Sequence, residues 1–127
     1  MSEPIKICAN TAWCHTKFML EKSALYNITV EKDQKWYDTR KLPSSPDGVD
    51  DIPWYLERSR PFLRIPSAKW FALIGCINRN KPYFLIGEGQ TVFQAEQDGE
   101  LICFANDVRG FYWNNSGSLL IKMERVG

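Results

Sequence analysis

The sequence predicts an all-β fold, an antiparallel β-sandwich or jelly roll of about eight short strands. Short apolar or alternating runs recur along the chain, and clusters of turn residues separate them roughly every ten residues. No segment has the apolar spacing of a convincing helix. The chain has 127 residues, 44% of them hydrophobic, which is enough to bury one core. Residues 1–127 are therefore expected to form a single domain.

The first strands are expected near the amino terminus. Residues 5–9 form a short apolar run that ends at Asn10. Residues 16–21 and 26–30 both alternate between two faces, with the two-residue period of half-buried strands. Because only a short polar turn separates the last two runs, we expect them to pair as a hairpin.

Residues 33–66 have no such period. This segment holds five of the seven prolines, and proline cannot donate a hydrogen bond to a sheet ladder. Long irregular connections are uncommon in compact domains and are usually functional. Two interpretations stay open: a surface loop packed over one end of the core, or a binding loop that uses aromatic residues such as Trp54 and Tyr55.

The second half of the chain is richer in strand signals. Residues 69–77 are almost entirely apolar, as expected of a central strand covered on both faces. Further short strands are expected at residues 83–86, 91–95, 101–105 and 119–123. The Asp98-Gly99 pair favours a tight hairpin leading into the strand at 101–105.

Bulk charge and cysteine content argue against several classes of function. Sixteen basic and 15 acidic residues leave a net charge of +1, which gives no electrostatic case for nucleic acid as a partner. No run approaches the roughly 20 apolar residues of a membrane span. The amino terminus lacks the features of a signal peptide, so we expect a cytoplasmic chain unless another route exports it. The four cysteines are expected to be reduced, and their spacing lacks the paired pattern of a zinc site.

A polar loop lies between the last two expected strands. It carries four side chains with oxygen atoms, Asn106, Asp107, Asn114 and Asn115. Carboxylate, amide and backbone oxygens are the ligands that calcium prefers. Asn and Asp are also ordinary turn residues, so a plain structural turn is the alternative. The apolar residues of the same loop, Val108, Phe111, Tyr112 and Trp113, are costly to expose, which indicates that the loop packs or binds something.

The pattern Asn-Asp-Val-x-Gly-x-Tyr-x-Asn-Asn-Ser-Gly-Ser at residues 106–118 resembles the C-terminal calcium and sugar loop of the PA-IL-type galactophilic bacterial lectins. The resemblance extends to Ala9-Asn10, to residues 26–30 followed by Trp36, and to the apolar strand at 70–77. It implies a galactose-binding-like β-sandwich that holds one calcium ion, with hydroxyl groups of the sugar completing the coordination of the metal.

Specific residues follow from this resemblance. The implied calcium ligands are the side chains of Asp107, Asn114 and Asn115, the backbone carbonyl of Phe111, and a backbone carbonyl near Thr39. Asp107 and Asn114, together with Val108 and Phe111, would also contact the sugar. The chain departs from the family pattern in two places, because Phe111 replaces a threonine and Arg109 replaces a proline. Backbone ligation by residue 111 survives that change of side chain.

The middle loop departs from the family more strongly. In the family, a histidine and a glutamine of this loop contact the sugar, and this chain has no counterpart of either between Pro43 and Arg60. Trp54 or Tyr55 would replace them as a stacking platform, because sugars present apolar C–H faces to aromatic rings.

The expected function is calcium-dependent carbohydrate binding without catalysis, with galactose or a related sugar as ligand. Because single sugar sites bind weakly and gain from multivalency, a homo-oligomer is expected. One alternative is a structural or protein-interaction sandwich that has lost its sugar. The other is a glycan-active enzyme that uses two converging carboxylates, for which the candidates are Asp38, Asp47, Asp50, Asp51 and Glu57.

Overall fold

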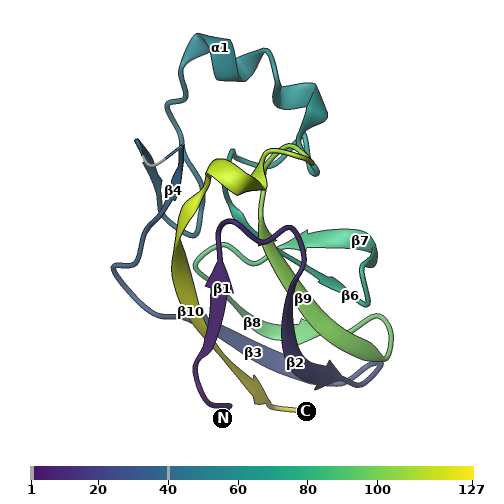
Figure 1. The fold of residues 1–127 in the computed structure, drawn as a ribbon. Helices are drawn as coiled ribbons and strands as arrows, with labels where there is room; N and C mark the ends of the chain where they lie inside the picture. Colours follow the sequence, from purple (N-terminus) through teal and green to yellow (C-terminus); the bar gives the residue numbers. More distant parts are fainter. Residues whose placement is uncertain (1, 40) are drawn as a thin grey trace.

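The computed structural model describes residues 2–39 and 41–127 (Figure 1). In this part of the chain, ten strands form two sheets in which every pair of neighbours is antiparallel. The strands are β1 (Ile5–Cys8), β2 (Cys14–Leu20), β3 (Leu25–Val30), β4 (Trp36–Asp38), β5 (Leu42–Ser44), β6 (Leu73–Ile77), β7 (Asn80–Leu85), β8 (Gly89–Gln94), β9 (Gly99–Ala105) and β10 (Ser116–Arg125). One sheet has the order β5-β4-β10-β3-β8, with β1 also paired to β10, and the other has the order β2-β9-β6-β7.

The predicted all-β antiparallel sandwich is confirmed, with two strands more than expected. Both extra strands, β4 and β5, lie in the proline-rich middle segment. β5 is an edge strand and contains Pro43, which is opposite Tyr37 of β4. A proline is tolerated there because an edge strand needs only half of its backbone donors for pairing. The proline content of this segment therefore does not exclude a short pair of strands.

Both predicted hairpins are wrong. β2 pairs with β9, whereas β3 pairs with β10 and β8, so the turn at residues 21–24 crosses from one sheet to the other. The turn at Asp98 also crosses between sheets, from β8 to β9. Alternation shows which face of a strand is buried. It does not show which strands pair, because two strands that face each other across the core have the same alternating pattern as two neighbours in one sheet.

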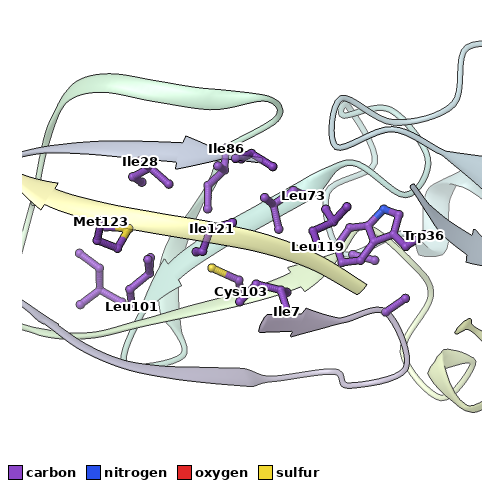
Figure 2. Packing of buried hydrophobic residues seen from close by; sticks show 14 of the residues in the cluster. Ile7, Ile28, Trp36, Leu73, Ile86, Leu101, Cys103, Leu119, Ile121 and Met123 are labelled. Atoms are coloured by element: carbon purple, nitrogen blue, oxygen red, sulfur yellow. The ribbon is translucent and has the colours of Figure 1, made fainter. Parts of the chain in front are cut away.

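The main core lies between the two sheets. Leu119, Ile121 and Met123 of β10 are at most 1% exposed, which confirms the alternation predicted for this strand. Figure 2 shows Ile121 and Met123 near Leu101 and Cys103 of β9, a strand of the opposite sheet, and Leu119 near Trp36. All four cysteines are free thiols, and Cys76 and Cys103 are buried.

A second apolar cluster covers the outer face of the four-stranded sheet. It consists of Ala72, Ile74, Cys76, Ile102 and Phe104, with Trp13, Ile65, Ala68 and Tyr83 packed against them. Because β6 contributes to both clusters, all five of its residues are buried, as predicted for a strand covered on both faces. The structure starts β6 at Leu73 and leaves Lys69–Ala72 as a loop.

Three short helical turns lie apart from the chain termini, at the opposite end of the sandwich (Figure 1). They are α1 (Trp54–Glu57), η1 (Arg60–Phe62) and η2 (Tyr112–Asn114). This end carries several exposed large side chains, namely Trp54, Tyr55, Phe62, Phe111 and Trp113. In the described residues, no helix is long and apolar enough to cross a bilayer.

Candidate functional site

A pocket of about 340 Å³ opens at the end of the sandwich that carries α1. The end of β4, the α1–η1 segment and the loop after β9 contribute its walls. Its lining residues are Asp38, Thr39, Leu56, Ser59, Phe62, Trp70, Asp107, Val108, Phe111 and Asn114. We call this cavity the Asp107 pocket.

Asn106 fixes the loop after β9 in place. Its side chain is fully buried and accepts a hydrogen bond from the backbone N–H of Ile65 at 3.0 Å. The same amide donates to the carbonyls of Ile65 and Lys69, each at 3.0 Å. The carbonyl of Asn106 also accepts from the backbone N–H of Phe71 at 2.8 Å. These contacts hold the next residue, Asp107, against the middle segment of the chain.

Asp107 is a buried carboxyl group, with only 2% of its surface exposed. One oxygen accepts a hydrogen bond from the backbone N–H of Val108 at 2.7 Å, and the other accepts from the side-chain amide of Asn115 at 2.9 Å. Burial raises the pKa of Asp107 to about 6, the charge of Asp38 adds to that rise, and the bond from Asn115 opposes it. Folding therefore disfavours the ionised form of Asp107, and a nearby positive charge would favour it.

A second carboxyl group, Asp38, lines the same pocket. Asp38 is 5% exposed, and its Oδ2 accepts a hydrogen bond from the indole N–H of Trp70 at 2.8 Å. Burial raises the pKa of Asp38, and the bond from Trp70 acts against that rise. The next residue, Thr39, has a positive φ of 54° and donates its hydroxyl to the carbonyl of Asp38 at 2.7 Å.

Two amide oxygens at the site have no hydrogen-bond partner. The Oδ1 atoms of Asn114 and Asn115 are both buried and unpaired. The Nδ2 of Asn115 is fully used, because it donates to the carbonyl of Ala9 at 3.0 Å and to Asp107. Unpaired buried acceptors are uncommon and costly, and a bound ion is one way to satisfy them. Residues 2–39 and 41–127 contain no group of three or more His, Cys, Asp or Glu side chains suited to a metal. A cation here would therefore depend on amide and backbone oxygens beside the two carboxylates.

The structure brings together most of the residues that the sequence singled out. Thr39, Asp107, Val108, Phe111 and Asn114 all line the Asp107 pocket. Asn115 does not line it but contacts Asp107 directly.

Trp54 and Tyr55 lie elsewhere. They are 70% and 58% exposed and do not line the pocket, because α1 presents Leu56 to it instead. Sequence reasoning missed Leu56 and Phe62, for which the irregular middle segment carries no signal. It placed Asp38 only among the enzyme candidates, although Asp38 follows the buried Trp36 at the two-residue spacing of a strand.

The five carboxylates suggested for an enzyme do not gather in the Asp107 pocket. Of the five candidates only Asp38 lines the pocket. Asp50 forms an ion pair with Lys69 at 2.6 Å, and Glu57 forms one with Arg60 at 2.8 Å. A larger pocket of about 540 Å³ lies near residues 29–35, but all of its charged lining residues are exposed.

Comparisons with known proteins support the fold. No protein-family model and no curated protein matches the chain. Among solved structures, one described as "EclA N-terminal domain; PllA-like lectin" superposes with a TM-score of 0.72. The match covers 97% of this chain and 95% of that one, at 15% sequence identity. The chain therefore has the fold of a lectin domain over nearly its whole length.

Proposed function

We propose that this chain is a calcium-dependent carbohydrate-binding domain of the PA-IL type, without catalytic activity. One observation carries the proposal. In a sandwich with the fold of a lectin domain, a buried carboxyl group lies in a pocket beside amide oxygens that have no donor.

The donor set fits a hard cation. Asp107, Asn114 and Asn115 would hold calcium through their side chains, and backbone carbonyls at Phe111 and near Thr39 would complete the protein ligands. Calcium accepts such a mixture of carboxylate, amide and carbonyl oxygens. A positive charge at this place would favour the ionised form of Asp107, and it would satisfy the two unpaired Oδ1 atoms. Asp38 adds a second negative charge beside the same position. When bound, the ion would supply open coordination positions for neutral sugar hydroxyls.

The rest of the pocket suits a sugar. Ligand pockets commonly combine apolar walls with a few polar groups. Leu56, Phe62 and Phe111 provide apolar surface for the C–H faces of a pyranose ring, and Val108 lies beside them. Asp107 and Asn114 would hydrogen-bond the hydroxyls. We propose galactose or a related sugar as the ligand, by analogy with the family that the loop resembles.

Trp54 and Tyr55 have a more limited role in this proposal. Both are exposed on α1 and lie outside the pocket. They would contact only a saccharide longer than the single ring held in the pocket.

A second candidate function rests on a different property of Asp107. Both of its oxygens already accept hydrogen bonds from the protein, and its pKa of about 6 allows the neutral form to persist in mildly acidic solution. A sandwich that folds without calcium and has lost its sugar would have the same hydrogen bonds to Asp107 and the same raised pKa. Such a chain would serve as a structural or protein-interaction domain.

A thermal-unfolding experiment separates the two functions. The melting temperature is measured with chelator, with calcium, with magnesium, and with calcium plus galactose or plus glucose. A ligand at about 100 times its Kd stabilises the native state by about 2.7 kcal/mol, which raises the melting temperature by several degrees in a domain of this size. Calcium is expected to produce such a rise, and galactose is expected to add to it.

Matched variants localise the effect. Asp107→Ala should abolish the calcium response, whereas Asp51→Ala, at an exposed acidic residue outside the pocket, should keep it. No response to calcium in the natural chain would refute the proposal. A calcium response without a galactose response would indicate a scaffold that calcium stabilises and that has lost its sugar.

A further inference from the structure

A second, basic pocket lies next to the Asp107 pocket. It has a volume of about 360 Å³, and Phe62 and Val108 line both cavities. Backbone contacts fix this shared wall, because Leu63 and Val108 form a β-bridge and the N–H of Arg64 donates to the carbonyl of Asp107 at 3.2 Å. Only the wall formed by Phe62 and Val108 therefore separates a ligand in the Asp107 pocket from the second cavity.

The second cavity carries three positive charges and no negative one. Arg64, Lys81 and Arg109 are among its lining residues, and no acidic residue is. The ion pairs found in the described residues involve none of these three cations. Three cations that line one cavity without a carboxylate among them create a local positive potential. We call this cavity the basic pocket.

Aromatic rings hold the cations in place. The guanidinium carbon of Arg64 lies 3.3 Å from the ring centre of Phe104 and 4.1 Å from that of Trp13. Its Nη1 donates to the Tyr112 hydroxyl at 3.0 Å, whereas its Nε and Nη2 are buried without a partner. The ring faces attract the guanidinium but carry no net charge. Arg64 is thus held in the wall of the basic pocket without an ion-pair partner among the described residues.

Arg109 and Lys81 form the exposed side of the pocket. Arg109 donates to the hydroxyl of Tyr83 at 3.1 Å and lies 5.4 Å from the ring centre of Trp13. The ammonium of Lys81 lies 5.9 Å from the ring centre of Tyr83. Arg109 is held by this contact but retains further N–H donors, which match the oxygens of a carboxylate or sulfate.

We propose that the basic pocket binds an anionic substituent, a sulfate ester or a carboxylate, on the saccharide held in the Asp107 pocket. This inference rests on the proposed carbohydrate-binding function. It deepens that function by naming an acidic glycan as the preferred ligand class. The neutral ring would occupy the Asp107 pocket, and the charged group would reach across the wall of Phe62 and Val108 to Arg109 and Lys81.

Titration calorimetry in calcium tests the inference with three ligands: a neutral galactoside, a sulfated galactoside and a galactoside carrying a carboxylated sugar. At least one charged ligand is expected to bind about tenfold tighter than the neutral one, and that ratio should fall with added salt. Comparison of the two charged ligands identifies which anion the pocket accepts. The double variant Lys81→Gln/Arg109→Gln should bring the ratio of charged to neutral affinity close to one. Lys41→Gln, at an exposed lysine that lines neither pocket, should keep the ratio.

The outcomes are distinguishable. If the neutral galactoside binds and no charged ligand binds more tightly, the basic pocket is not an anion site and only this inference fails. A preference that survives in the double variant also overturns it, because the charged group must then bind elsewhere. If no saccharide binds in calcium, the proposed function fails and this inference fails with it.

Discussion

In calcium-free solution, the free energy of unfolding of Asp107→Asn relative to that of the natural chain should increase as the pH rises from acidic to neutral. The reason is the raised pKa of this buried carboxyl. In the unfolded chain the group loses its proton near its ordinary pKa of 3.8, whereas in the folded protein it does so only at about 6. As the pH rises between these values, the unfolded state releases its proton first, so the natural chain loses stability. Asparagine cannot ionise and does not undergo this loss.

The size of the effect follows from the two pKa values. A shift of about two units corresponds to about 3 kcal/mol of stability lost by the natural chain above the folded pKa. About 1 kcal/mol of this is already lost at about pH 4.5, because the unfolded carboxyl has begun to ionise there. Asp107→Asn also sacrifices one accepted hydrogen bond, either from Val108 or from Asn115, at about 1 kcal/mol at every pH.

Urea unfolding in chelator measures the difference between the two chains at each pH. The variant minus natural difference in the free energy of unfolding should rise by about 2 kcal/mol between about pH 4.5 and about pH 7.5. Taking this difference removes the contributions of all other groups except the repulsion between Asp107 and Asp38, which has the same sign. A difference that stays constant across this range would show that Asp107 titrates normally in the folded protein.

Calcium should reverse the order of stability. At about pH 7.5, saturating calcium stabilises only the chain that retains the carboxylate, by about 2.7 kcal/mol at 100 times the Kd. The variant that is more stable in chelator then becomes the less stable one. Stabilisation of both chains by the same amount would place the calcium site away from Asp107.

Three further predictions address the rim of the pocket, its support and the thiols. Phe111→Ala should weaken galactose binding by roughly tenfold, because it removes apolar surface from the pocket, whereas Trp113→Ala, at a 78% exposed residue that does not line the pocket, should leave the affinity unchanged in calorimetry. Asn106→Ala should lower the free energy of unfolding by about 3 kcal/mol, since it leaves several buried backbone groups without partners, and an unchanged urea midpoint would contradict this. Burial raises the pKa of the thiols of Cys76 and Cys103, so a thiol reagent should modify them only after unfolding, and rapid labelling of all four cysteines in the native protein would contradict the structure.

The strands could be predicted from the sequence wherever burial leaves a period. Leu119, Ile121 and Met123 alternate because one face of β10 lies on the core, and β6 is uniformly apolar because both of its faces are covered. The same patterns do not report which strands are neighbours. For that reason the sequence predicts hairpins at the turns before β3 and before β9, although each of these turns carries the chain from one sheet to the other.

The candidate site was predictable only where it is local in sequence. Asp107, Asn114 and Asn115 lie within one loop, so their side chains were expected to share a site. The opposite wall comes from residues about fifty positions earlier, where Leu56 and Phe62 belong to single helical turns with no repeating pattern. Only tertiary contacts bring that wall to the loop, through Asn106 and the bridge between Leu63 and Val108.

The contrast between Asn106 and Asp107 argues for a ligand more strongly than either residue does alone. Asn106 is fully buried, and both its amide nitrogen and its amide oxygen have partners, which is the ordinary way to bury a polar side chain. One residue later, the chain buries a carboxyl group in a pocket that a second carboxyl group, Asp38, also lines, and it leaves two asparagine oxygens unpaired nearby. The same loop thus contains one buried amide with all of its hydrogen-bond partners and two with an unpaired oxygen. Local departures from good hydrogen bonding are typical of sites where a ligand completes the set of contacts, and the calcium ion that we propose would supply a partner to all three side chains.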